Sequence, residues 1–138
     1  MRFMVIVKAD RNSEAGVMPS TELLTAMGKF NQEMVKAGVM LAGEGLHPSS
    51  RGARIKYSGK QRTVTEGPFS GSSDLVSGFW LIQVRSQDEA IEWMKRAPFD
   101  GGSEIEIRQV FDAKDFGEAL TPELREQEQR LRTQAAKM

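Results

Sequence analysis

The sequence predicts an α+β fold of the ferredoxin-like type, a split β-α-β arrangement with an antiparallel sheet. Two amphipathic helices are each flanked by apolar strands, so strand–helix–strand order occurs twice along the 138 residues. A chain of this length can bury a core without disulfide bonds. The last stretch has a different sequence pattern from the rest of the chain. We therefore expect a domain at 1–118 and a helical extension at 119–138.

The first unit begins with a strand at 2–9 whose apolar residues fall on both faces. A helix at 21–38 follows, because leucine, methionine and phenylalanine recur there at three- and four-residue spacing. Gly38 ends this helix at the position where a left-handed backbone is favourable. A strand at 39–46 completes the unit.

A polar alternating segment at 54–65 predicts an inserted β-hairpin between the two units. The second unit starts with the most apolar strand, 78–84, which we expect in the middle of the sheet. Ser86 and Glu89 form a capping-box pattern at the start of the second helix. The alternation of isoleucine with charged residues at 104–110 predicts the last strand.

The tail reads as a separate helix that begins with Thr121 as cap and Pro122 in the first turn. Its apolar residues Leu124, Leu131 and Met138 recur every seven residues and form one narrow stripe. A stripe of this width does not hold a helix alone. We expect the tail to pack on its own domain or on a neighbouring subunit.

Two helices cover only one face of such a sheet. The strands at 2–9 and 78–84 are nevertheless apolar on both faces. The uncovered face must meet another apolar surface, most simply the same face of a second copy. The sequence therefore predicts a homodimer.

The composition limits which other partners and cofactors are expected. The 19 acidic and 19 basic residues give a formal net charge of zero, so we expect neither nucleic acid nor membrane as a partner. The absence of cysteine and the single histidine predict no disulfide, no metal site and no cofactor. The apolar start of the chain is too short for a signal peptide or a membrane span, and we expect a cytoplasmic protein.

The segment Glu66-Gly67-Pro68-Phe69, followed by a Ser/Gly-rich loop at 70–74, admits two interpretations. In one, Glu66 is a partly desolvated general base or acid beside an apolar wall formed by Phe69. In the other, Gly67-Pro68 changes the direction of the chain and Phe69 anchors the loop in the core.

Glu44 and His47 are the next candidates. Glu44 lies between Gly43 and Gly45, whose lack of side chains lets a ligand or another strand approach closely. The alternative is a β-bulge with a carboxylate that pairs with an arginine. His47 has a pKa suited to proton transfer near neutrality, or it is a plain loop residue.

Arginines on the predicted strands are candidate anion-binding groups. Arg54, Arg62 and Arg108 lie opposite apolar faces and can bind an anionic substrate. Alternatively, they are solvated or pair with Glu104 and Glu106 across strands.

Four segments together resemble one known family. "AGEGL" at 42–46, "TEGPF" at 65–69, "SGFWLIQVRSQDEAIEW" at 77–93 and "SEIEIRQVF" at 103–111 are similar to the YCII-related, DGPF-domain family, and "LTPELREQEQRLR" resembles the tail of one branch. The resemblance implies the dimeric α/β-barrel form of the ferredoxin-like fold. Some members resemble dehydrochlorinases or isomerases, and others are associated with extracytoplasmic-function sigma factors.

The chain departs from the family pattern in two places. The motif Asp-Gly-Pro-Phe-Ala-Glu-Thr-Lys-Glu is replaced here by "EGPFSGSSD" at 66–74. The family's proposed His–Asp pair has its histidine on the first helix, and the helix predicted at 21–38 contains none. That activity therefore does not carry over to this chain.

Three functions remain in competition. The first is a homodimer that binds a small organic molecule in a cleft beside the sheet, with Glu44, His47, Glu66 and Phe69 as lining and Gly45, Arg54 and Arg108 as further contacts. The second is a proton-transfer enzyme, dehydrochlorinase- or isomerase-like, with Glu66 or Glu44 as base and His47 as acid. The third is a regulatory module linked to sigma-factor-type transcription control, with the 121–138 helix as its docking element.

Overall fold

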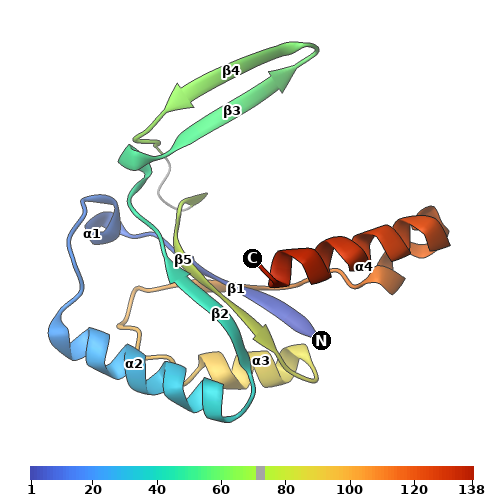
Figure 1. The fold of residues 1–138 in the computed structure, drawn as a ribbon. Helices are drawn as coiled ribbons and strands as arrows, with labels where there is room; N and C mark the ends of the chain where they lie inside the picture. Colours follow the sequence, from blue (N-terminus) through green and yellow to red (C-terminus); the bar gives the residue numbers. More distant parts are fainter. Residues whose placement is uncertain (71–73) are drawn as a thin grey trace.

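A computed structural model describes residues 1–70 and 74–138, so the loop predicted at 70–74 lies largely outside the described residues. All the predicted helices and strands are present (Figure 1). In chain order the elements are β1 Arg2–Lys8, α1 Arg11–Glu14, α2 Thr21–Lys36, β2 Met40–Gly45, the 3-10 helix η1 Ser49–Arg51, β3 Ala53–Ser58, β4 Gln61–Glu66, β5 Val76–Gln83, α3 Gln87–Met94, β6 Ile105–Gln109, the 3-10 segment η3 Ala113–Ala119 and α4 Pro122–Ala136.

The main sheet has four strands in the order β2-β5-β1-β6, and every neighbouring pair is antiparallel. The helix α2 connects β1 to β2, and α3 connects β5 to β6. The strands of the two units alternate in this order, which confirms a mixed α+β fold with an antiparallel sheet. The apolar strands β1 and β5 occupy its middle, and for β5 the sequence predicts this position.

Both long helices of the two units pack on the same face of the sheet. Phe3 and Val5 from β1 and Trp80 and Ile82 from β5 point toward them and are buried. The helices contribute the buried residues Phe30 and Met34 from α2 and Ala90 and Met94 from α3. These side chains form the core cluster.

The ends of α2 and α3 follow local signals, with one correction. Gly38 has φ +71°, in agreement with a left-handed helix end. The Ser86 hydroxyl accepts from the Glu89 amide at 3.1 Å, but the Glu89 carboxylate accepts from the Arg85 amide instead of closing the predicted capping box at Ser86. The helix α3 ends at Met94, because the next turns tighten to three-residue hydrogen bonds.

The opposite face of the sheet is apolar in its middle and charged at its edges. Ile6 pairs with Phe79 and Met4 with Leu81 across β1 and β5. Glu44 on β2 and Glu106 on β6 are in register with the Ile6–Phe79 pair, and Arg108 on β6 is in register with the Met4–Leu81 pair. The charged residues therefore lie on the two edge strands. We call the four apolar residues the open face: Met4, Ile6, Phe79 and Leu81.

The C-terminal helix α4 lies on the opposite side of the strands from α2 (Figure 1). Every residue of α4 is exposed, with Leu124 at 48% and Leu131 at 53%. A groove of about 1090 Å³ separates α4 from the segment around Phe111 and Phe116, whose rings contact each other at 5.1 Å between centroids. Two i, i+4 ion pairs lie along α4, Glu126–Arg130 and Glu128–Arg132.

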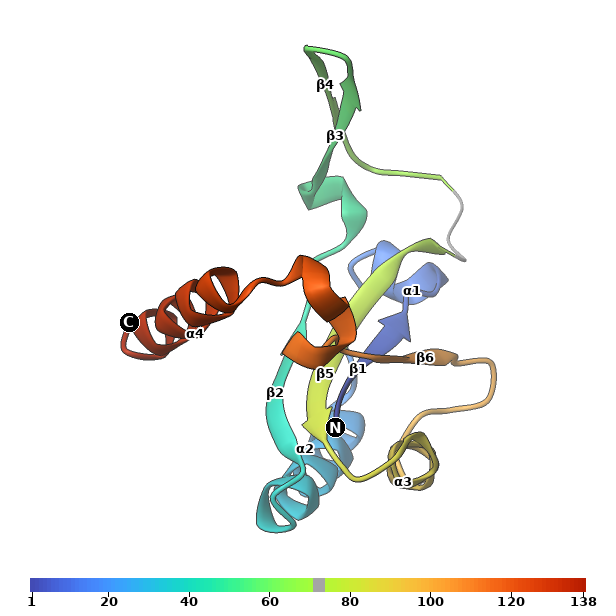
Figure 2. The same ribbon diagram turned by 90° about the vertical axis from the view of Figure 1, so that its right-hand side faces the viewer.

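The hairpin β3–β4 projects away from the rest of the chain in both views (Figures 1 and 2). All its residues are exposed, and Ile55 pairs with Val64 on one face. An isolated two-stranded hairpin is only marginally stable in water. Its position therefore depends on how its base is attached to the rest of the chain.

None of the helices in the described part of the chain combines the length and apolar character that a membrane crossing needs.

Gly43 provides a test of how tightly the sheet is packed. A Cβ at Gly43 would lie 2.7 Å from Cδ1 of Trp80, whereas a Cβ at Gly45 on the same strand meets nothing within 4 Å. We expect Gly43→Ala to lower the free energy of unfolding by about 1–3 kcal/mol because the buried indole must move. Gly45→Ala should stay within about 0.5 kcal/mol of the wild type. Urea unfolding followed by circular dichroism measures both, and equal stabilities would contradict the packing.

Candidate functional site

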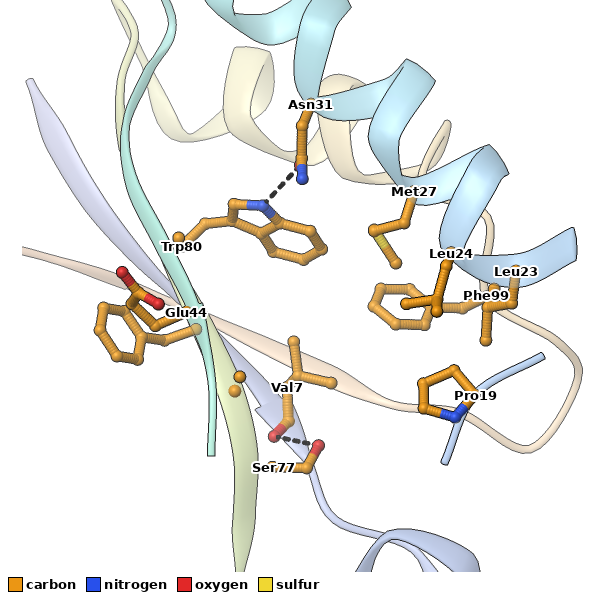
Figure 3. Close-up of a pocket in the computed structure, with 14 residues that line it drawn as sticks. Val7, Pro19, Leu23, Leu24, Met27, Asn31, Glu44, Ser77, Trp80 and Phe99 are labelled. Carbon is orange, nitrogen blue, oxygen red and sulfur yellow. Dashed lines mark hydrogen bonds between the residues drawn. The ribbon is translucent and has the colours of Figure 1, made fainter. Parts of the chain in front are cut away.

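A cavity of about 350 Å³ lies between α2 and the sheet (Figure 3). Residues from β1, the segment before α2, α2, β2, β5 and the segment after α3 line it: Val7, Pro19, Leu23, Leu24, Met27, Asn31, Gly43, Glu44, Gly45, Ser77, Gly78, Phe79, Trp80 and Phe99.

The cavity exists because α2 is buried along only part of its length. Its fully buried residues, Phe30 and Met34, belong to the C-terminal half of the helix. Leu24, in the N-terminal half, keeps the same apolar character but is 56% exposed. The first turns of α2 therefore border an open space instead of packing directly on the strands.

Trp80 closes one end of the cavity. Its ring is 5% exposed and makes edge contacts with Phe30 at 5.8 Å and Phe99 at 6.0 Å between centroids. Its Nε1–H donates to Oδ1 of Asn31 at 3.0 Å (Figure 3). A buried indole needs such a partner for its N–H group, and α2 supplies it from within its apolar stripe.

The other side-chain polar atoms at the cavity are few. The Ser77 hydroxyl lies 3.4 Å from the carbonyl oxygen of Val7 and from that of Lys8. Glu44 borders the cavity but pairs with Phe79, whereas its neighbour Gly43 pairs with Trp80. Because successive strand residues alternate between faces, the Glu44 carboxylate points to the opposite side of the sheet from the indole, as Figure 3 shows.

The predicted site residues fall in several places. Glu44 and Gly45 lie at the cavity. His47 is exposed in the loop after β2, and its ring nitrogens lie 3.1 and 3.2 Å from Nη1 of Arg51. Glu66 is exposed at the end of β4. Neither His47 nor Glu66 lines this cavity or the groove beside α4; their catalytic roles stay predictions.

The predicted arginines are engaged locally. The Arg54 guanidinium lies over the ring of Phe69 at 3.9 Å, and that of Arg62 lies over Tyr57 at 4.7 Å. Arg108 hydrogen-bonds to Glu106 on its own strand at 3.2 Å. This bond, with Lys8 nearby, holds the pKa of the Glu106 carboxyl below its ordinary value.

Glu14, Ser49 and Phe69 join three segments at the base of the hairpin, and we call them the hairpin clasp. The Glu14 carboxylate accepts from the Ser49 amide at 2.9 Å and from its hydroxyl at 2.5 Å. The Ser49 hydroxyl oxygen in turn accepts from the Phe69 amide at 3.0 Å. The hydroxyl and amide bonds from Ser49 lower the pKa of Glu14.

The glycine of the Glu-Gly-Pro-Phe segment is required by the clasp. A Cβ at Gly67 would lie 1.8 Å from the carbonyl oxygen of Ser49, and the Gly67 amide donates to the Gly52 carbonyl at 3.0 Å. Phe69 is half-buried against Arg54 and lies outside the main core cluster. The segment thus has an architectural role, which fixes the base of the hairpin and does not reach the core.

Among the described residues, no group of three or more His, Asp or Glu side chains is arranged to hold a metal ion.

Comparison with known proteins identifies the family. The model of the YCII-related domain matches residues 1–114. The chain belongs to the YCII-related domain family. The tail that contains α4 lies beyond the matched residues.

This YCII-related chain is similar to one curated protein, and one solved structure aligns with it. An uncharacterised protein of Rhizobium meliloti (strain 1021) is 28% identical over 69 residues, which are 50% of this chain and 56% of the relative, so the match spans about half of each protein. The structure of 5-chloro-2-hydroxyhydroquinone dehydrochlorinase (TftG) from Burkholderia phenoliruptrix AC1100, in complex with 2,5-dihydroxybenzoquinone, aligns with 15% identity and a TM-score of 0.40 over 81% of this chain and 96% of that chain.

Sequence reasoning missed the polar residues of the cavity, Asn31 and Ser77. It placed Leu23, Leu24 and Met27 on the apolar face of α2; Met27 packs against the core cluster, and all three border the cavity. One signal was present. Asn31 interrupts that stripe between Met27 and Met34, and a polar residue in an apolar stripe requires a hydrogen-bond partner.

The hairpin clasp makes a prediction about acid. Because the folded pKa of Glu14 is lowered, its stabilising contribution is complete above about pH 4.3, the ordinary glutamate value, and is lost as the pH falls through the lower folded pKa. The Ser49 amide resonance should follow this titration, and the protection of the Phe69 amide from hydrogen exchange, corrected for the intrinsic rate at each pH, should fall in acid. Glu14→Gln should remove the titration, whereas the same titration in Glu14→Gln would exclude Glu14 as its source.

Proposed function

We propose that this YCII-related protein is a homodimer of the ferredoxin-like, dimeric α/β-barrel type that binds a small organic molecule in the cavity between α2 and the sheet. The observation that carries the binding proposal is the cavity itself. Its volume of about 350 Å³ lies in the range of small-molecule sites, and its walls are apolar with a few polar atoms. A half-exposed Leu24 at its border leaves room for entry.

The dimer proposal rests on the open face. Four strands with this order and antiparallel pairing agree with a ferredoxin-like sheet, and α2 and α3 cover one side of it. The other side has an apolar middle at Met4, Ile6, Phe79 and Leu81 with charged residues at the sheet edges. An apolar centre with a polar rim is the usual composition of a subunit interface. Two copies joined by these faces form the barrel.

The C-terminal helix fits the same proposal as an extension, 119–138, that packs on the second copy. A helix of this length is marginal in water without tertiary contacts, and α4 is exposed throughout. It lies on the side of the sheet away from α2. A second copy against the open face is therefore placed to cover Leu124 and Leu131 as well.

Blocking the cavity tests the binding proposal. Native mass spectrometry of the protein taken directly from cells should show a retained small molecule. Leu24→Trp should place a larger side chain in the cavity and reduce the occupied fraction strongly. A ligand would then have to enter a filled space, which costs roughly 1–3 kcal/mol. Leu46→Trp is the matched control, since Leu46 is 50% exposed and does not border the cavity. Equal occupancy in Leu24→Trp and the wild type would place the ligand elsewhere.

A charge on the open face tests the dimer. Wild-type protein should scatter light as two chains at micromolar concentration, and Met4→Glu should scatter as one, because burial of an unpaired carboxylate costs several kcal/mol. Met18→Glu, at a position 81% exposed between α1 and α2, should remain dimeric. A dimeric Met4→Glu protein would rule out this face as the interface.

A further inference from the structure

The amide of Asn31 is held in one orientation by Trp80. The indole Nε1–H is a donor only, and it lies 3.0 Å from Oδ1 of Asn31. A rotated amide would place its N–H groups against the indole N–H. The oxygen of Asn31 must therefore face Trp80, and its Nδ2 atom faces elsewhere.

Trp80 is not free to release this bond. Its ring is 5% exposed and is held at two edges by Phe30 and Phe99. On the sheet side, it lies so close to Gly43 that a Cβ there would be 2.7 Å from Cδ1. The packing thus fixes the indole, and the indole fixes the amide.

The two N–H groups of Asn31 Nδ2 remain available. Within the residues that the structure describes, no hydrogen-bond acceptor satisfies them. Asn31 is half-buried and lines the cavity. Ser77, the other polar side chain, lies near Val7 on the strands, apart from Asn31 in Figure 3.

The remaining walls provide no charge. The carboxylate of Glu44, the one ionisable residue among the lining residues, points to the other side of the sheet. The wall opposite the strands is built from Leu23, Leu24 and Met27. An ion without a partner is strongly disfavoured in such surroundings.

The geometry points to a ligand class: an uncharged, ring-sized organic molecule with a carbonyl-type oxygen that accepts a hydrogen bond from Asn31 Nδ2. This inference rests on the proposed function, because it names what the same cavity selects. Asn31 is then the specificity-determining residue. A ligand without the acceptor leaves the Asn31 donors unpaired and binds about tenfold more weakly.

Two matched probes test the selection. Acetophenone carries a carbonyl oxygen, and α-methylstyrene has the same shape with a methylene group in its place. Each is titrated to millimolar concentration into the 138-residue chain while the Trp80 indole N–H resonance is followed by NMR. The chain has two tryptophans, and Trp93→Phe assigns the two signals.

Asn31→Asp is the decisive variant, because its carboxylate still accepts from Trp80 but has no N–H to donate. Asn31→Leu removes the donors without adding a charge. We expect both probes to shift the Trp80 signal in the wild type, and the affinity ratio of acetophenone to α-methylstyrene to fall about tenfold in both variants.

The outcomes distinguish the Asn31 inference from the proposal that the cavity binds a small molecule. If both probes shift Trp80 but the ratio is unchanged in Asn31→Asp and Asn31→Leu, the cavity binds by shape alone; the Asn31 inference is then wrong and the proposed function stands. If neither probe shifts Trp80 and no retained molecule is found in protein from cells, both are wrong.

Discussion

Burial of the Trp80 indole is the interaction on which the centre of this protein depends. A ring of this size in the middle strand of the sheet requires a missing side chain on the neighbouring strand, which Gly43 provides. Its N–H requires an acceptor, which Asn31 provides from α2. Phe30 and Phe99 contact its edges. The same ring forms one end of the cavity, so core packing and the candidate binding site are parts of one arrangement.

A second constraint comes from the number of helices. With α2 and α3 on one side, the sheet has one covered face, and its middle strands are apolar on both. Three parts of the chain have exposed or partly exposed apolar residues: the open face, the hairpin β3–β4 and the helix α4. In the proposed dimer, a second copy covers part of this apolar surface. Uncovered apolar surface is therefore the basis of both the dimer proposal and the proposed role of the tail.

The Glu-Gly-Pro-Phe segment has a definite structural part in this arrangement. Gly67 fits beside the Ser49 carbonyl where no side chain can, and the Phe69 amide bonds to the Ser49 hydroxyl. Glu14, from a short helix that sequence periodicity does not predict, closes the clasp. Glu66 itself stays exposed at the end of β4. The segment that is most conspicuous in the sequence thus attaches the hairpin, while the cavity is built from other residues.

The sequence by itself determined the main helices and strands, their order and the core strands, because these depend on local periodicity, capping residues and turn chemistry that are read along the chain. The family followed from four short segments that resemble it. The strands at 2–9 and 78–84 were identifiable from their apolar runs, and the C-terminal end of α2 from Gly38. Only the tertiary structure decided which side of the sheet each side chain faces. Glu44 and Gly43 are neighbours in the chain but lie on opposite faces, and Asn31 meets Trp80 across 49 residues. The cavity could not be predicted because it arises where the N-terminal half of α2 stands away from the sheet, and that gap depends on the packing of distant residues.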